Sequence, residues 1–197
     1  MSRIALFTDG SINTNLKIGF GAYLLVPESY LEETSCDVMK KEVKVKKFES
    51  TSSTKLEIET LLWALEELEK SHKEIDLYCK VTLYTDSQCI ACLSGRRTKL
   101  ERSKFKSSKT NNELNNALLY RKFYRCSDRL KFEIIKLKGH SKSHLKDTLH
   151  KVFFQVDKAS RKALRAYLDK NAKSVARQAN GKRKKRNNPI LTQSRKK

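Results

Sequence analysis

The sequence is poor in proline and glycine, with two and six residues respectively among 197. This shortage excludes collagen-like chains and low-complexity chains rich in these residues. No apolar run approaches the roughly 20 residues that a membrane span needs, so we expect no membrane partner. The first residues also lack the apolar stretch and the cleavage site of a signal peptide. We therefore expect a cytoplasmic protein, or a nuclear one if the host is eukaryotic.

The five cysteines are an odd number without a regular framework, which is typical of a protein from a reducing compartment. Cys89 and Cys92 form a C-x-x-C pair, but no second Cys or His pair at zinc spacing accompanies them. We interpret the two residues as thiols packed in a helix. The cysteine pattern thus favours neither a disulfide framework nor a zinc site.

Acidic residues are also scarce, at 22 Asp+Glu against 43 Lys+Arg, which gives a formal net charge of +21. Residues 170–197 contain 11 Lys+Arg and no acid. Because few large apolar side chains accompany this charge, we predict a folded domain over residues 1–173 and a basic, disordered tail over residues 174–197. Such a tail attracts phosphate through counterion release, and a merely solubilising tail is the alternative.

The pattern of apolar residues predicts alternating strands and helices. Strand-length apolar or alternating runs cover Ile4–Thr8, Ile18–Val26, Glu42–Lys46, Leu77–Thr85 and Phe132–Leu137. Helical spacing covers Thr54–Lys70, Ser87–Leu93, Asn112–Cys126 and Leu149–Leu168. This order indicates an α/β fold in which helices pack on a five-stranded mixed sheet.

Two of the predicted strands end in an acid, the first in Asp9 and the fourth in Asp86. If these strands are parallel neighbours, both acids lie at the sheet edge where ligands bind in α/β proteins. A local alternative is that Asp9 starts a turn and that Asp86 caps the next helix. Glu57 stands at the start of a predicted helix in an S/T-x-x-E pattern beginning at Thr54, so a capping role is the alternative there.

Five short segments follow one another in a recognisable order. They read FTDGS at residues 7–11, STKLEI at 53–58, YTDSQ at 84–88, KGHS at 138–141 and VDKAS at 156–160. With these segments, spread over residues 4 to about 168, the chain resembles the ribonuclease H family, of the type related to bacterial ribonuclease HI. The resemblance implies the ribonuclease H-like fold, a five-stranded mixed β-sheet flanked by α-helices.

The resemblance implies a catalytic site with four acidic metal ligands, Asp9, Glu57, Asp86 and Asp157. Their hard oxygens suit two Mg²⁺ ions, or Mn²⁺. His140 matches the family's loop histidine, which assists proton transfer or product release. The interval from His140 to Asp157 is longer than usual, so Asp147 is a rival fourth ligand; we prefer Asp157 because it heads an apolar helical run.

Residues that contact nucleic acid are also implied. Ser53 and Thr54 stand where many members carry paired asparagines, and Gln88 matches a glutamine that reads the RNA strand. After Asp9 the usual glycine-rich turn is absent, so Ser11 and either Asn13 or Asn15 are the candidates there; of the two asparagines, we assign Asn15. The basic stretch over residues 96–109 resembles a protrusion that grips the DNA strand, although a solvated charged loop would look the same. Its candidates are Arg96, Arg97, Lys99, Arg102 and Lys104.

The resemblance implies an endoribonuclease that cleaves the RNA strand of RNA–DNA hybrids by a two-metal-ion mechanism, leaving 5′-phosphate and 3′-hydroxyl products. Other nucleases of the same fold, acting on DNA or double-stranded RNA, are one alternative. A non-catalytic basic protein that binds nucleic acid is another. We expect a monomer that binds an RNA–DNA hybrid. The sequence does not indicate which proteins bind it.

Overall fold

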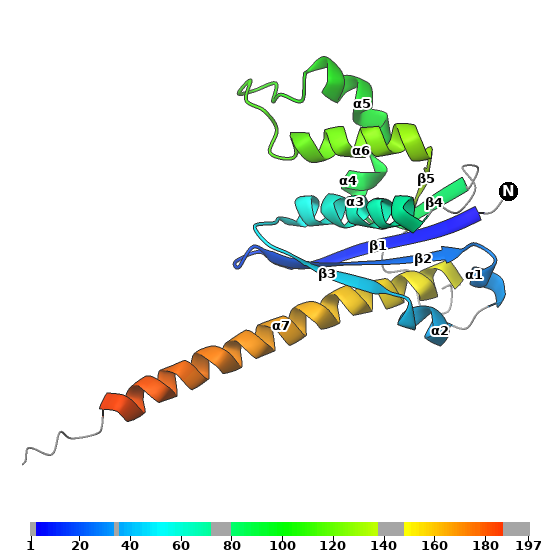
Figure 1. Ribbon diagram of the computed structural model, residues 1–197. Helices are drawn as coiled ribbons and strands as arrows, with labels where there is room; N and C mark the ends of the chain where they lie inside the picture. The colour runs from blue at the N-terminus through cyan, green and yellow to red at the C-terminus, as the bar shows by residue number, and fades with distance from the viewer. Residues whose placement is uncertain (1–2, 34–35, 72–79, 138–147, 187–197) are drawn as a thin grey trace, which may run out of the picture. The chain divides into compact units, whose positions relative to one another are not determined.

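A computed structural model describes residues 3–33, 36–71, 80–137 and 148–186. Within these residues it contains one five-stranded sheet of order β3-β2-β1-β4-β5 (Figure 1). The strands are β1 (Arg3–Asn13), β2 (Ile18–Pro27), β3 (Lys44–Phe48), β4 (Lys80–Thr85) and β5 (Glu133–Lys136). The β1–β2 and β2–β3 pairs are antiparallel, and the β1–β4 and β4–β5 pairs are parallel. The predicted mixed sheet is confirmed.

Helices cover both faces of this sheet (Figure 1). On one face lie α3 (Ser53–Ser71), α4 (Gln88–Ala91), α5 (Leu93–Arg102) and α6 (Ala117–Leu130). On the other lie α1 (Tyr30–Glu33), α2 (Cys36–Lys41) and the first turns of α7 (Thr148–Arg186). The chain divides into two compact units, residues 1–164 and residues 165–197. No helix among the described residues is long and apolar enough to cross a membrane.

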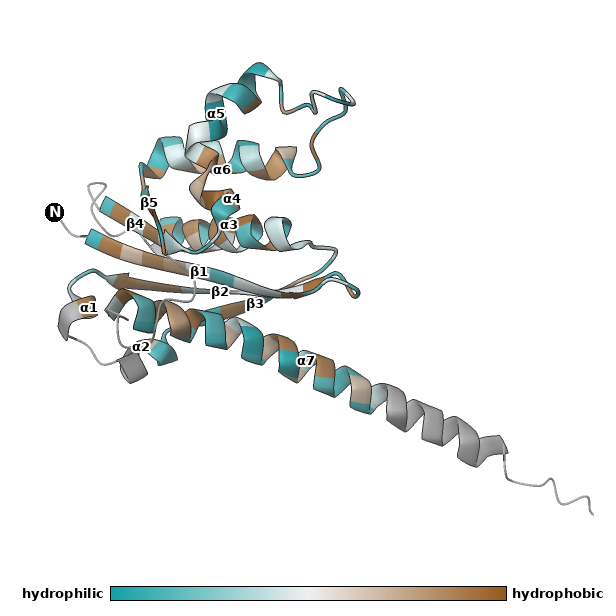
Figure 2. Cartoon of the chain, turned by 180° about the vertical axis from the view of Figure 1, so that it is seen from behind, coloured by the Kyte–Doolittle hydropathy of each residue, from teal (hydrophilic) through white to brown (hydrophobic). Residues whose placement is uncertain are grey.

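The alternation of side chains along β1 builds a separate core on each face. Leu6 faces α3 and joins a cluster with Leu61, Leu65 and Leu83. Phe7 faces the opposite way and joins a cluster that includes Val152 and Val156 of α7 and Met39 of α2. Figure 2 shows apolar residues along the central strands and on the adjoining helices. Both cores therefore fix the orientation of the strand that carries Asp9.

Glycines in the β1–β2 hairpin let α3 approach the sheet closely. A Cβ atom on Gly21 would lie 1.9 Å from Thr60 Oγ1, and one on Gly19 would lie 2.6 Å from Leu56 Cδ2. Any larger side chain at these positions would push the helix outward. The first half of α3, which carries Glu57, is thus seated directly on the hairpin.

Several boundaries differ from the sequence-based expectations. Asp9 does not end its strand, because β1 continues to Asn13 and pairs with β2 as far as Ile18. The last helix extends to Arg186 rather than Leu168, since good helix formers continue and the next proline is Pro189. Part of the basic stretch belongs to a helix, α5, rather than to a loop. Residues 77–79 of the predicted fourth strand lie outside the described residues, and the division into residues 1–173 and 174–197 stays a prediction.

Candidate active site

The β1–β4 register brings Asp9 and Asp86 together. The parallel pairing ends at Phe7 opposite Tyr84, and the same offset continued by two positions places Asp9 opposite Asp86. Asp9 is no turn residue, because it pairs with Ala22 inside the β1–β2 hairpin. The two acids therefore meet at the carboxyl end of the parallel strand pair, where the β1 backbone continues past β4.

The helix caps are made by serines and not by the acids. Ser87 caps α4, since its Oγ accepts a hydrogen bond from the backbone N–H of Ile90 at 3.2 Å. At the start of α3, Ser52 Oγ accepts from the backbone N–H of Lys55 at 3.3 Å. Neither Asp86 nor Glu57 is therefore needed as a cap. Both carboxylates instead line a pocket that they share with Asp9.

Glu57 reaches from α3 toward the loop that carries Asp86. The hydroxyl of Ser87 donates to Glu57 Oε2 at 2.6 Å, in addition to its role as cap of α4. Ser87 is buried, so this bond fixes the glutamate side chain without a charged partner. One serine thus joins the acid of α3 to the end of β4.

On the opposite side of the sheet, α7 contributes Asp157 and Ser160. The fully buried Ser160 hydroxyl donates to Asp9 Oδ2 at 3.0 Å and lies 2.9 Å from the carbonyl oxygen of Asp157. The carboxylate of Asp157 accepts from Arg161 Nε at 2.6 Å. Consequently, α7 holds the acid of β1 and adds a fourth acid beside it.

The pKa values show that these carboxylates act on one another. The pKa of Asp9 is raised to about 6, chiefly by burial and next by the negative charge of Asp86; the hydrogen bond from Ser160 opposes the rise, and the charge of Asp157 adds to it. Burial also raises the pKa of Asp86, with the charge of Asp157 adding to it. For Glu57, burial raises the pKa, the Ser87 bond opposes the shift, and the charge of Asp86 adds to it. Repulsion therefore links Asp9 to Asp86 and Asp157, and Glu57 to Asp86.

The pocket has the chemistry of a divalent-cation site. Its lining consists of Thr8, Asp9, Glu57, Thr85, Asp86, Ser87 and Ile90. The described residues contain no preformed group of three close His, Cys, Asp or Glu ligands. However, clustered carboxylates whose charged forms are disfavoured gain from a bound cation, and their oxygens are the ligands that Mg²⁺ and Mn²⁺ prefer. The donor set thus fits such ions.

The polar candidates around the pocket lie on three elements. Ser11 lies two residues after Asp9 and so on the same face of β1. Asn13 Oδ1 accepts from the backbone N–H of Leu16 at 3.0 Å and closes the turn, whereas Asn15 is exposed. Ser53 and Thr54 form the first turn of α3. The assignment of Asn15 as a ligand contact stays a prediction.

Gln88 is held in place by two neighbours. Lys136 at the end of β5 donates to Gln88 Oε1, and Gln88 Nε2 lies 2.8 Å from Cys92 Sγ. The positive charge of Lys136 also acts on Asp86, where it opposes the rise in pKa that burial causes. Sequence analysis missed Lys136, although pairing of β5 with β4 places it opposite Thr85.

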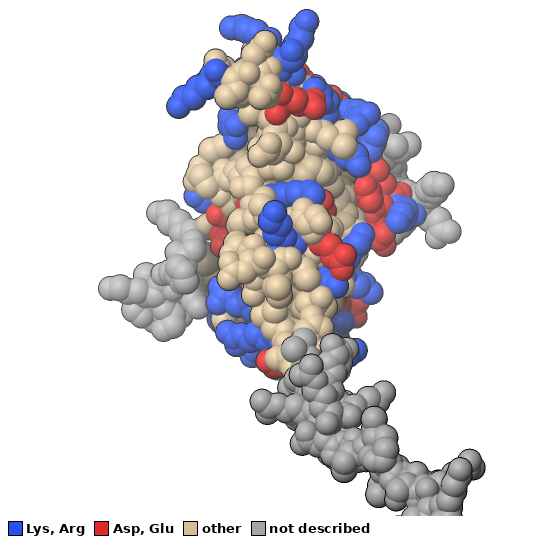
Figure 3. Space-filling model, turned by 90° about the vertical axis from the view of Figure 1, so that its left-hand side faces the viewer, with Lys and Arg blue, Asp and Glu red and all other residues tan. Residues whose placement is uncertain are grey.

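Of the basic candidates, Arg96 and Arg97 contact side chains of the protein, whereas the other three are exposed to solvent. Arg97 Nε lies 2.8 Å from Glu101, and Nη2 lies 2.9 Å from Asp128, which ties α5 to α6. Arg96 lies over the ring of Tyr120 at 5.9 Å from its centre. Lys99, Arg102 and Lys104 are exposed. Figure 3 shows Lys and Arg side chains extending from the part of the surface formed by α5 and the segment after it.

Two sequence candidates, His140 and the rival ligand Asp147, lie outside the described residues. Sequence analysis also missed the partners of the acids, Ser87, Ser160 and Arg161. Two of them had a local signal: Ser87 follows Asp86 directly, and Arg161 stands four residues after Asp157 on the same face of a helix. The contact of Ser160 with Asp9 had none.

The family model of RNase H matches residues 1–164. The chain belongs to the ribonuclease H family. This membership makes it a nuclease-type hydrolase of a family that binds RNA–DNA hybrids and generally uses divalent metal ions. A comparison with curated proteins gives no match. The family match ends at Leu164, the last residue of the first compact unit.

Proposed function

We propose that the chain is an endoribonuclease that hydrolyses the RNA strand of RNA–DNA hybrids. The observation that supports this most strongly is that Asp9, Glu57 and Asp86 line one pocket, while the charge of Asp157 acts on Asp9 and Asp86. They come from β1, α3, the end of β4 and α7, and their mutual repulsion contributes to the raised pKa values. No local pattern requires four acids from distant elements to meet, whereas binding of divalent ions does.

In this proposal the four carboxylates hold two Mg²⁺ ions, or Mn²⁺. Such ions, held by these carboxylates, would supply an activated water molecule and charge stabilisation of the leaving 3′-oxygen, and the products would carry a 5′-phosphate and a 3′-hydroxyl. Ser87 and Ser160 orient Glu57 and Asp9 through hydroxyl groups, which add no charge to the pocket. His140 assists proton transfer or product release.

Recognition of the substrate rests on different surfaces for the two strands. Near the pocket, Ser11, Asn15, Ser53, Thr54 and Gln88 contact the strand to be cut, where 2′-hydroxyl groups mark RNA. Around α5, the candidates Arg96, Arg97, Lys99, Arg102 and Lys104 hold phosphates of the DNA strand. The basic residues after position 173 add non-specific attraction, and the protein acts as a monomer in the cytoplasm, or in the nucleus of a eukaryotic host.

A cleavage assay on three matched duplexes tests the proposal. The full chain is incubated with an RNA–DNA hybrid, duplex DNA or duplex RNA, in Mg²⁺, in Mn²⁺ or in EDTA, and the product ends are mapped. We expect cleavage of the hybrid alone, only with added ions, with 5′-phosphate ends. Cleavage of another duplex would indicate a different nuclease of this fold. Binding of the hybrid without cleavage in either ion would refute the enzymatic proposal.

A further inference from the structure

Arg161 covers one of the four acids. Its Nε lies 2.6 Å from Asp157 Oδ1, one turn away on α7. The side chain of Asp157 is 17% exposed and that of Arg161 is 56% exposed. The guanidinium group therefore binds an oxygen of an acid whose charge acts on Asp9 and Asp86, while more than half of its own side chain is exposed to solvent.

The other acids have different partners. Asp9 and Glu57 accept hydrogen bonds from the uncharged hydroxyls of Ser160 and Ser87. Positive charge from Lys136 and Arg161 acts on Asp86. Of these two cations, Arg161 pairs directly with Asp157, whereas Lys136 donates to Gln88. Arg161 is thus placed to act on Asp157 and Asp86 together.

We infer that Arg161 is a positioning residue, an internal counter-ion of Asp157 that a divalent cation must displace. The inference rests on the proposed function, which assigns Asp157 to ion binding. A guanidinium charge next to a doubly charged ion is strongly repelled, so the ion pair and the bound ion compete for the same carboxylate. Arg161 therefore sets the ion concentration at which the pocket fills.

In the ion-free chain the same contact has a second effect. It neutralises the carboxylate of Asp157 and so reduces the repulsion that Asp9 and Asp86 experience. Removal of the guanidinium should destabilise the ion-free state and strengthen ion binding at the same time. This pair of opposite changes distinguishes a counter-ion from a residue that only supports the helix.

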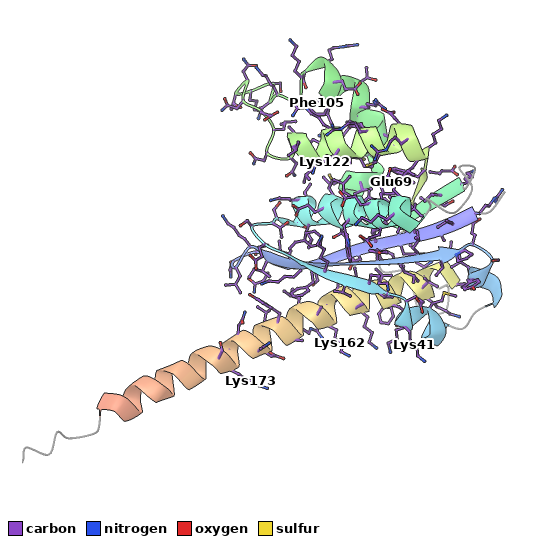
Figure 4. The ribbon with its side chains drawn as sticks, in the orientation of Figure 1. Lys41, Glu69, Phe105, Lys122, Lys162 and Lys173 are labelled. Atoms are coloured by element: carbon purple, nitrogen blue, oxygen red, sulfur yellow. The ribbon has the colours of Figure 1, made fainter. Side chains whose placement is uncertain are left out.

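Titration calorimetry with MnCl₂, without nucleic acid, tests the inference on the full chain. We expect Arg161→Gln to bind Mn²⁺ about threefold to tenfold more tightly, as loss of a partly exposed competing ion pair implies. Arg161→Lys should lie between this variant and the unaltered chain. The matched control is Lys162→Gln, which removes the same charge from the next residue. Lys162 projects from α7 on the side away from the sheet (Figure 4), so the affinity should stay within about twofold.

Thermal melting gives the second readout. Arg161→Gln should melt at a lower temperature than the unaltered chain in EDTA and gain more on addition of Mn²⁺. An unchanged or weaker Mn²⁺ affinity in folded Arg161→Gln would overturn the inference.

Asp157→Asn separates the inference from the proposed function. If it loses Mn²⁺ affinity while Arg161→Gln resembles the unaltered chain, the counter-ion role alone fails. If it keeps full affinity, Asp157 is no ion ligand, and the assignment of the fourth acid fails with the inference.

Discussion

Around Asp9 the chain buries carboxylates next to other carboxylates, whereas between α5 and α6 it pairs arginines with acids at the surface. In the first region burial and like charges raise the pKa of Asp9 to about 6. In the second, Arg97 has two acidic partners, and Arg121 lies 2.6 Å from Glu113. Repulsion between carboxylates thus lowers the stability of the fold around Asp9, where a cation would bind. The ion pairs between α5 and α6 do not lower it in this way.

Loss of one carboxylate from the pocket is the sharpest way to break this comparison. Asp9→Asn should reduce hybrid cleavage by about 10³-fold, because an ion ligand worth several kcal/mol in the transition state is removed. Initial rates in Mg²⁺ measure the effect. Glu49→Gln, which alters an exposed acid paired with Lys47, is the control and should retain full activity. Full activity of Asp9→Asn would refute the assignment of Asp9.

The next largest effect is expected where α3 packs on the β1–β2 hairpin. Gly21→Ala should lower the free energy of unfolding by about 1–3 kcal/mol, because the new methyl group overlaps Thr60. Denaturant titration measures this change, and Thr60→Ala in the same chain should restore part of it. Gly95→Ala is the matched control, since nothing lies within 4 Å of its new Cβ. In the helix α5 this control should gain about 0.5–1 kcal/mol.

The raised pKa of Asp9 predicts how stability depends on pH in EDTA. The folded state binds a proton more tightly than the unfolded chain, whose Asp pKa is near 3.8. The stabilising contribution is therefore complete below about pH 3.8 and is lost as the pH rises through about 6. At pH 7, Asp9→Asn should raise the free energy of unfolding by about 1–3 kcal/mol, at 1.36 kcal/mol per pKa unit.

Asp128→Asn, on α6, is the variant with which this pH profile is compared. The Asp128 pKa is lowered by its hydrogen bond with Arg97, so the sign is reversed. Its stabilising contribution is present at neutral pH and is lost as the pH falls through the lowered pKa. Asp128→Asn should therefore destabilise the chain at pH 7. The same direction of change in both variants would contradict the contrast between the regions.

The exposed basic residues should affect binding more than stability. Replacement of Lys99, Arg102 and Lys104 by Gln should weaken hybrid binding and lower the salt slope by about one for each phosphate that is no longer neutralised. The unfolding free energy should change by no more than about 0.5 kcal/mol per substitution, as is usual at exposed positions. Binding isotherms at several salt concentrations test each of the three single variants, with Lys122→Gln on the exposed surface of α6 as the charge-matched control.

Features of the site that depend on neighbouring residues in the sequence could be predicted, whereas contacts between residues far apart in the sequence could not. Asp9, Glu57, Asp86 and Asp157 were predicted because they stand in short local motifs; the structure links Asp9 to Asp86 and Asp157, and Glu57 to Asp86. Their partners depend on tertiary register: nothing near Ser160 in the sequence indicates that it contacts Asp9. The extension of β1 to Asn13 was missed for the same reason, since the pairing with β2 sustains it. The roles of the predicted residues in catalysis and binding stay predictions.

The register of β1 has a consequence for how mutations can affect this protein. Phe7 and Asp9 share one face of the strand, and Leu6 and Thr8 share the other. A slip of one residue would turn Asp9 toward α3 and would exchange the two core residues at the same time. Misalignment of the pocket is therefore coupled to loss of both hydrophobic layers. A chain with a shifted strand would fail to fold before it could persist as an inactive but stable enzyme.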